Sequence, residues 1–317
     1  MAKGTRAGRL THRLEALDAI GADRARGYDK ALKALKQLWQ PGRQPQQIRL
    51  RAAFMEASPP ATDPPPLSQL IASRGYALRV ALLALFAAQI KKGAAAHHLE
   101  LPLIATRSDE IAWTDLVVAP VAPGKGSAAR SAHDKRTRSA RAALTRIAQP
   151  DISLAELPRA HQPKGGYDEV RLYEDTGPRT FGHPVPYRIP NSGNDVLDIP
   201  VNFFLNGWIY VLEDTELVTY LMYRRLCSQA SPAHISSDLR RERFGIKQSA
   251  WENYWLLVDS GLLLVEHDEN RRPDGTFAEQ SAGATPLRHR FTLRDEGLSN
   301  DGLRVVWGAV DRRMGRR

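Results

Sequence analysis

The apolar residues in the carboxyl-terminal third of the chain recur at helical spacing in three consecutive segments. The first segment opens at Asp214, a residue type that caps helices, and the second opens at Ser236 or Ser237. Gly245 provides a turn before the third segment, residues 247–258. This spacing predicts three short helices in succession, each with one apolar face.

A strand pattern follows these segments. Every second residue from 287 to 293 is apolar or a histidine, and these residues alternate with Arg288, Arg290 and Thr292. This is the period of a half-buried strand, and it places the arginines on the solvent side. A turn at 271–275 separates the strand from an earlier apolar run, so we expect a two-stranded hairpin.

Three helices followed by such a hairpin, or wing, are the arrangement of a winged helix, whose third helix fits the major groove of DNA. Any small three-helix domain with a hairpin gives the same pattern. We favour the winged helix over that alternative.

A similar order of elements lies upstream. Residues 75–90 are typical of a strongly apolar helix, 111–118 of a short second helix and 131–148 of a basic third helix. A hairpin is expected between 152–157 and 167–173. The order is again helix, helix, helix, wing, which predicts a tandem of two related units in a mainly α fold with small β-hairpin wings.

This tandem resembles the winged-helix superfamily and, in layout, the plasmid replication initiators that carry two winged helices. The resemblance covers most of residues 67–294 and depends on element order and generic Leu and Gly positions. It implies binding of double-stranded DNA and, with less support, initiation of replication.

The flanking segments predict further divisions. A proline-rich stretch is typical of a stiff, extended linker. We therefore expect a basic helical arm at 1–57, this linker at 58–66, a first winged helix at 67–190, a second at 191–300 and a basic tail at 301–317.

The arm carries an apolar stripe, formed by Leu10, Leu14, Leu17, Leu32, Leu35 and Leu38. An isolated pair of helices is marginal in water, and an exposed apolar strip usually marks a contact surface. Two explanations compete: the arm folds back on the first winged helix, or it pairs with another chain. We favour a homodimer, because dimer symmetry matches the symmetry of operators.

Charge is distributed unevenly along the chain of 317 residues, whose formal net charge is +10. Residues 121–150 hold seven basic side chains and one acidic one, whereas 201–270 hold six basic and ten acidic ones. A basic segment suits a polyanionic partner. The third helix of the first unit is therefore the better candidate for contacting phosphates and bases.

The candidate DNA-binding residues follow from these assignments. In the first unit they are Arg130, Lys135, Arg136, Arg138, Arg141 and, at the wing tip, Lys164. In the second unit they are Lys247, Gln248, Ser249 and Asn253 in the third helix, and Arg271, Arg272, Arg288 and Arg290 in the wing. Trp251 and Trp255 beside them belong either to the core or to a protein interface.

Signals for chemistry are weak. Residues 119–127 lack the glycine and hydroxyl positions of a phosphate-binding loop. His97 and His98 are adjacent and would point apart on a helix, with no visible partner cluster beyond Glu100. We therefore expect no enzymatic activity, no cofactor and no metal. Cys227 is the only cysteine, which excludes an internal disulfide framework.

The expected function is sequence-specific binding of double-stranded DNA by a transcriptional regulator in the cytoplasm, associated with the nucleoid. One alternative is a plasmid or mobile-element replication initiator that binds an origin and recruits a host replication protein. Another is an adaptor whose winged helices bind proteins. The most apolar segment is too short to span a bilayer, so no membrane partner is expected.

Overall fold

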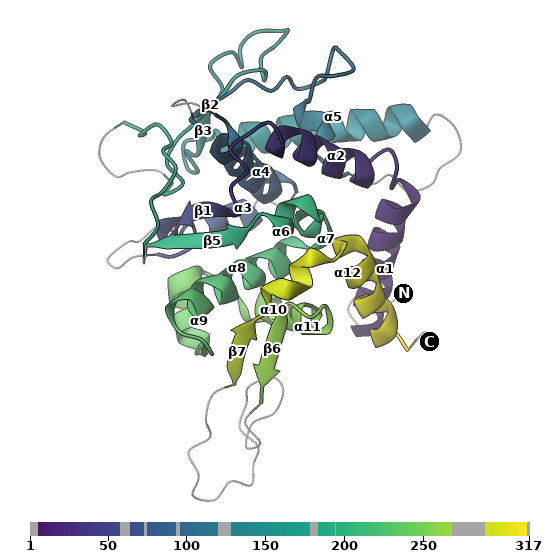
Figure 1. Cartoon of the computed structure of the whole chain (residues 1–317), viewed down its shortest axis with the longest axis vertical. Helices are drawn as coiled ribbons and strands as arrows, with labels where there is room; N and C mark the ends of the chain where they lie inside the picture. The colour runs from purple at the N-terminus through teal and green to yellow at the C-terminus, as the bar shows by residue number, and fades with distance from the viewer. Residues whose placement is uncertain are drawn as a thin grey trace, which may run out of the picture.

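Helices make up about half of the described residues, and three small antiparallel sheets lie among them (Figure 1). The computed structural model describes residues 6–57, 64–72, 75–92, 96–119, 128–177, 183–193, 195–267 and 289–315. The expectation of a mainly α fold with small antiparallel sheets is confirmed. None of the helices in these ranges is long and apolar enough to cross a membrane.

The first unit, residues 77–172, contains two long helices and a three-stranded sheet. Helix α4 (Ala77–Ile90) is almost entirely buried and packs against α5 (Ala128–Ile147). Strands β2 (His98–Leu99), β3 (Ala155–Glu156) and β4 (Val170–Leu172) form a sheet in the order β2-β4-β3. The predicted hairpin is therefore present, and β2 joins its free side.

The predicted helix at 111–118 is wrong. Only one 3-10 turn forms there, η2 (Trp113–Asp115). The amides of Trp113 and Thr114 donate to the carbonyls of Pro102 and Leu103, so this backbone is held by a neighbouring segment and not by its own helix.

The second unit, residues 214–293, follows the same order. It contains α8 (Asp214–Gln229), α9 (Ser237–Phe244), α10 (Gln248–Trp251), α11 (Tyr254–Asp259), β6 (Leu263–Glu266) and β7 (Arg290–Leu293). The Ser236 hydroxyl caps α9 by accepting from the Leu239 amide, and Gly245 ends this helix in the left-handed region at φ 64°. The expected third helix is broken at residues 252 and 253 into α10 and α11.

The sheet of the second unit also has a third member. Ala233, between α8 and α9, exchanges two 2.8 Å backbone hydrogen bonds with Phe291 of β7. The order across this sheet is Ala233, β7, β6, which matches β2-β4-β3 in the first unit. In both units the segment after the first helix pairs with the last strand of the hairpin.

The remaining sheet lies between the two units and joins them (Figure 1). Strand β1 (Gln47–Arg51) pairs antiparallel with β5 (Val196–Pro200), with Ile48 opposite Ile199 and Leu50 opposite Leu197. These four side chains are buried, and the residues between them are more exposed. The alternation is that of strands with one face on a core.

The amino-terminal helices belong to the same core, so the separate arm expected at 1–57 is wrong. Helix α1 (Arg6–Ala22) packs against α12 (Gly302–Arg313), and α2 (Tyr28–Trp39) packs against α4 and α6 (Asn202–Leu205). Leu10, Leu14, Leu17 and Leu35 are buried, with Leu32 and Leu38 packed against the core. The stripe predicted to form a homodimer is therefore covered within one chain.

Two further boundaries need correction. The linker expected at 58–66 ends inside α3 (Pro66–Ala72), which begins at Pro66, and residues 58–63 lie outside the described ranges. The tail expected at 301–317 is mostly α12, whose Leu303, Val306 and Val310 are buried. The short elements η1 (Ala52–Phe54), α7 (Trp208–Val211) and η3 (Asp295–Ser299) complete the fold.

Buried ion pairs fix α8 to the rest of the chain. Arg13 of α1 donates to the Glu216 carboxylate at 2.7 Å and also to the Val211 carbonyl. Arg79 of α4 pairs with Asp214, the residue expected to cap α8. The backbone amide of Glu213 instead donates to Glu216 at 2.7 Å. Burial raises the pKa of Glu216, while the charge of Arg13 opposes this shift.

We predict that Leu35→Ala lowers the free energy of unfolding by about 2–5 kcal/mol, because Leu35 is fully buried. The exposed Lys33→Ala should change it by about 0.5 kcal/mol or less. Urea unfolding measures both, and light scattering should show the same oligomeric state for both variants. A dimer that dissociates on Leu35→Ala would contradict the intramolecular burial of this stripe.

We predict that Arg13→Met costs about 3–5 kcal/mol of stability at neutral pH, because it leaves the Glu216 carboxylate buried without its partner. Adding Glu216→Gln should recover much of this loss. The pKa of Glu216 is raised in the folded state, so its charged form destabilises the folded variant. The loss of stability should therefore grow as pH rises through this raised pKa. It should shrink as pH falls toward 4.5, the ordinary pKa of a Glu side chain. Equal losses in the single and double variants would contradict this account.

Candidate nucleic-acid interface

One face of α5 is exposed and carries positive charge. Arg138 and Arg141 are exposed on it, on the side opposite the buried Ala140, Leu144 and Ile147. At about 1.5 Å per residue, this helix of 20 residues is about 30 Å long. Such a helix is long enough to place several side chains along a major groove, which admits an α-helix.

Arg136 was expected on this surface, and the structure places it elsewhere. Its guanidinium lies 3.4 Å from Asp23, in the turn between α1 and α2, and both side chains are only 13% exposed. Arg136 precedes Ala140, Ala143 and Ile147 by four, seven and eleven residues, so helical geometry puts it on the buried face. It is a packing residue, not a base reader.

The wing contacts this helix through Tyr167. The Arg141 guanidinium lies 5.6 Å from the centre of the Tyr167 ring, and the Tyr167 hydroxyl is 3.1 Å from the Thr145 hydroxyl. A cation over an aromatic face is attracted by the ring and loses freedom. Arg141 is therefore held in place by the segment between β3 and β4.

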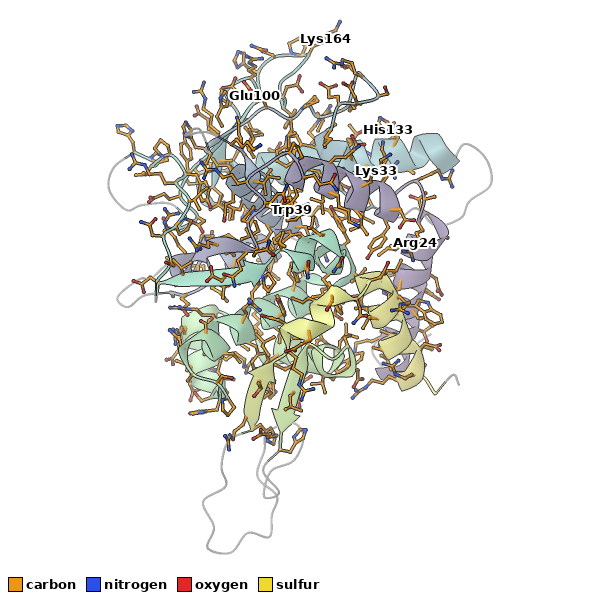
Figure 2. All side chains as sticks on the ribbon, in the orientation of Figure 1. Arg24, Lys33, Trp39, Glu100, His133 and Lys164 are labelled. Carbon is orange, nitrogen blue, oxygen red and sulfur yellow. The ribbon has the colours of Figure 1, made fainter. Side chains whose placement is uncertain are left out.

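That segment adds further basic residues. Lys164 and His161 are exposed, and Figure 2 shows Lys164 at the outer end of the molecule, beyond His133 of α5. Arg159 pairs with Glu169 at 3.1 Å, beside Arg171 at 2.9 Å and His98 at 3.2 Å from the same carboxylate. Lys164 is thus exposed in the segment between β3 and β4, as the predicted wing tip requires. Glu169 is surrounded by three basic groups.

The two remaining predicted residues of α5 are Lys135 and Arg130. Lys135 is half-buried and has an interaction partner. The backbone of Arg130 lies in α5, but its side chain is not among the side chains that the structure describes.

In the second unit the four residues predicted for the third helix differ in their surroundings. Lys247 and Gln248 are exposed, and the Gln248 carbonyl accepts from the Arg240 guanidinium at 2.7 Å. Burial lowers the pKa of Arg240, whose side chain also donates to the Ile246 carbonyl. Arg240 therefore holds the turn between α9 and α10 from inside.

Asn253 does not face outward. Its side-chain amide donates to the Thr215 hydroxyl of α8 at 3.0 Å, at the point where the third helix breaks. The side chain of Ser249 is outside the description. The break shortens the surface that this helix can present, so the second unit has fewer candidate contacts than expected.

The two tryptophans of this region pack within the chain, Trp251 buried and Trp255 half-buried. Trp251 is buried, and its indole nitrogen donates to the Tyr223 hydroxyl at 2.7 Å. The Arg313 guanidinium of α12 lies 4.5 Å from the centre of a Trp255 ring and pairs with Asp259. Both side chains are thus used within the chain, which supports the core alternative over a protein interface.

In the second wing, Arg290 is exposed and lies 3.5 Å from Glu266 across the β6–β7 pair. The predicted Arg271, Arg272 and Arg288 lie outside the described residues, as does most of the former phosphate-loop candidate at 119–127.

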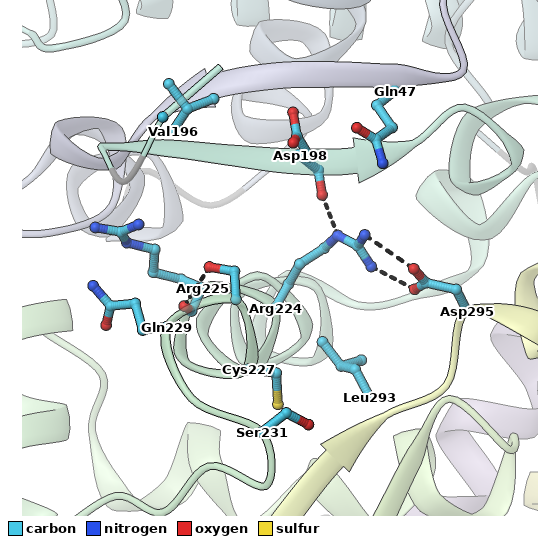
Figure 3. A pocket seen from close by; sticks show the side chains of 12 residues that line it. Gln47, Val196, Asp198, Arg224, Arg225, Cys227, Gln229, Ser231, Leu293 and Asp295 are labelled. Carbon is cyan, nitrogen blue, oxygen red and sulfur yellow. Dashed lines mark hydrogen bonds and ion pairs between the residues drawn. The ribbon is translucent and has the colours of Figure 1, made fainter.

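A polar cavity of about 680 Å³ lies between β5 and α8 (Figure 3). Arg224 bridges it by donating to the Asp198 carbonyl and to the Asp295 carboxylate. Cys227 lines it, and burial raises the pKa of this thiol, which makes it a weak nucleophile. An internal ion pair between Arg224 and Asp295 thus spans the cavity. Among the described residues, no cluster of three potential metal ligands is found.

No family model matches the chain, and neither a curated protein nor a solved structure matches it. Sequence reasoning missed Tyr167 as a functional residue, although an aromatic residue near a basic wing tip was a usable signal. It also missed the ion-paired group around Glu169, which depends on contacts between β2, β4 and the wing.

Proposed function

We propose that this protein binds double-stranded DNA in a sequence-specific manner through two winged helices. The observation that carries the proposal is the repeated element order, together with the exposed basic face of α5 in the third-helix position. In the first unit α4, the 3-10 turn η2 and α5 precede a hairpin, and in the second unit α8, α9 and the broken pair α10 and α11 precede one. In each unit the last strand of the hairpin also pairs with a segment after the first helix. This is the layout in which the third helix enters a major groove.

The first unit supplies most of the reading surface. Within the described residues, no carboxylate forms an ion pair with Arg138 or Arg141, and Tyr167 orients Arg141 toward the wing side. An arginine held in one orientation can donate two hydrogen bonds to a guanine edge. Lys164 on the wing contacts backbone phosphate, a position that fixes register without reading sequence.

The second unit plays a supporting part. Its described exposed candidates are Lys247, Gln248 and Arg290, in a region where acidic side chains outnumber basic ones. We assign it fewer phosphate contacts and a secondary share of sequence reading. No chemical step is assigned to either unit.

Occupation of an operator-like site, and hence control of transcription, is the role that this surface fits. The second candidate role is origin binding by a replication initiator that contacts a host replication protein. It is favoured by one observation: both units share one core within a single chain, so a single copy carries two candidate reading elements. A map of the bound genomic sites separates the two roles.

We predict that duplex binding depends steeply on salt. If Arg138, Arg141, Lys164, Lys247 and Arg290, with Lys135, neutralise about six phosphates, log K should fall against log salt with a slope near −5. Fluorescence anisotropy with a selected duplex at several salt concentrations measures this slope. An affinity that stays constant across that range would contradict the electrostatic part of the proposal.

We predict that Arg141→Ala costs about 1–3 kcal/mol of binding to the preferred duplex and relaxes the preference at one base pair. Arg136→Ala is the matched control from the same helix, because its side chain faces Asp23. It should leave the affinity within about twofold while lowering thermal stability. A larger loss of binding from Arg136→Ala than from Arg141→Ala would overturn the assigned face of α5.

A further inference from the structure

A second cavity, of about 690 Å³, lies beneath the carboxyl end of α5. Its walls come from the end of this helix, from β3 and from residues 173–177 and 184–185. A volume between about 300 and 1,000 Å³, with apolar and aromatic walls and few polar groups, is typical of sites for small molecules. Nothing in the proposed DNA contacts uses this space.

The lining has a definite chemical character. Apolar side chains such as Ala148, Leu157 and Val185 and the rings of Tyr167 and Tyr173 share this lining with uncharged polar side chains, which are Thr145, Gln149, Ser153 and Thr176. The charged groups in the described lining are two carboxylates, Glu156 and Glu174, and no Lys, Arg or His belongs to it. This is unusual for a chain with a net charge of +10.

The two carboxylates are not equivalent. Glu174 pairs with Arg51 at 3.2 Å, so its charge is already compensated. Glu156 accepts from the Tyr173 hydroxyl at 2.9 Å, and no ion pair to it is found in the described part of the chain. Arg171 stands opposite Glu156 in the strand register, but its guanidinium bonds to Glu169. Glu156 is thus an exposed carboxylate at this cavity whose recorded partner is the Tyr173 hydroxyl.

We propose that this cavity binds a small organic cation with an aromatic or aliphatic body. The cationic head pairs with Glu156 and lies against a tyrosine ring, an arrangement that attracts ammonium groups. The apolar body fills the space against Ala148 and Leu157. The same charge pattern disfavours a phosphate or carboxylate ligand.

Occupation of the cavity also affects DNA binding, a consequence that rests on the proposed function. Tyr167 and Thr145 line the cavity, and the same Tyr167 ring holds Arg141. A ligand that engages Tyr167 competes with Arg141 for it, and so loosens a side chain assigned to base reading. The cation is therefore expected to act as an effector that weakens binding to the duplex.

The first experiment tests binding without DNA. Ligand-observed NMR with the full chain and benzyltrimethylammonium should show saturable binding with a Kd of about 1 mM or tighter, given its small number of atoms. Benzyl alcohol and benzoate, the neutral and anionic matches, should bind at least about tenfold more weakly. Glu156→Gln should weaken binding of the cation about tenfold, whereas the exposed Glu252→Gln should not.

The second experiment measures affinity for a duplex with and without saturating benzyltrimethylammonium. Sodium chloride at equal ionic strength is the reference in this comparison, because tetramethylammonium carries the same head group as the probe. A decrease of about threefold or more relative to sodium chloride in the wild type, and a smaller one in Tyr167→Leu, supports coupling through Tyr167. Absence of saturable binding, or equal binding of all three probes, overturns the site. Saturable binding without an effect on DNA affinity overturns the coupling alone, and a chain that binds no duplex overturns the proposed function but not the site.

Discussion

The antiparallel pair of β1 and β5 is the constraint on which the arrangement of the molecule depends. It brings residues 47–51 beside residues 196–200, and its buried face joins the cores of both units. Around it, Arg51 places its guanidinium 2.6 Å from the fully buried Asp175, and Arg13 reaches Glu216. Removing one partner of such a buried pair leaves an uncompensated charge, which is costly. The two units are therefore held together as one structure.

This rigidity changes how DNA recognition is best understood. A protein whose two units swing on a flexible linker adapts to variable spacing, whereas units fixed by a shared core accept one spacing. The N-terminal helices, expected to pair two chains, instead help to fix this spacing by packing on α4, α6 and α12. In the proposed function, a single chain thereby supplies the two reading units that a dimer supplies in many helix-turn-helix proteins. The exposed basic face of α5 and the Tyr167 contact determine, in the same proposal, how this end of the molecule meets DNA.

Local patterns in the sequence were sufficient for α4, α5, α8, α9 and both hairpins, because apolar periodicity and caps such as Ser236 act within one element. The strands β1 and β5 were missed, although Ile48 and Leu50 alternate with arginines, because each strand is short and its partner lies about 150 residues away. The apolar stripe of α1 and α2 was recognised, but no local signal tells an intramolecular partner from an intermolecular one. Within the site, Arg138, Arg141 and Lys164 are exposed as expected, whereas Arg136 and Asn253 were misplaced because their partners, Asp23 and Thr215, are distant in sequence.

The central claim is that one copy of the chain carries two DNA-reading units at a fixed separation. Hydroxyl-radical footprinting on a selected duplex, with stoichiometry measured by analytical ultracentrifugation, tests it most directly. The account predicts one protein per site and two protected segments whose spacing is the same in every selected duplex. A single protected segment, or a complex that needs two chains to protect both segments, would contradict it.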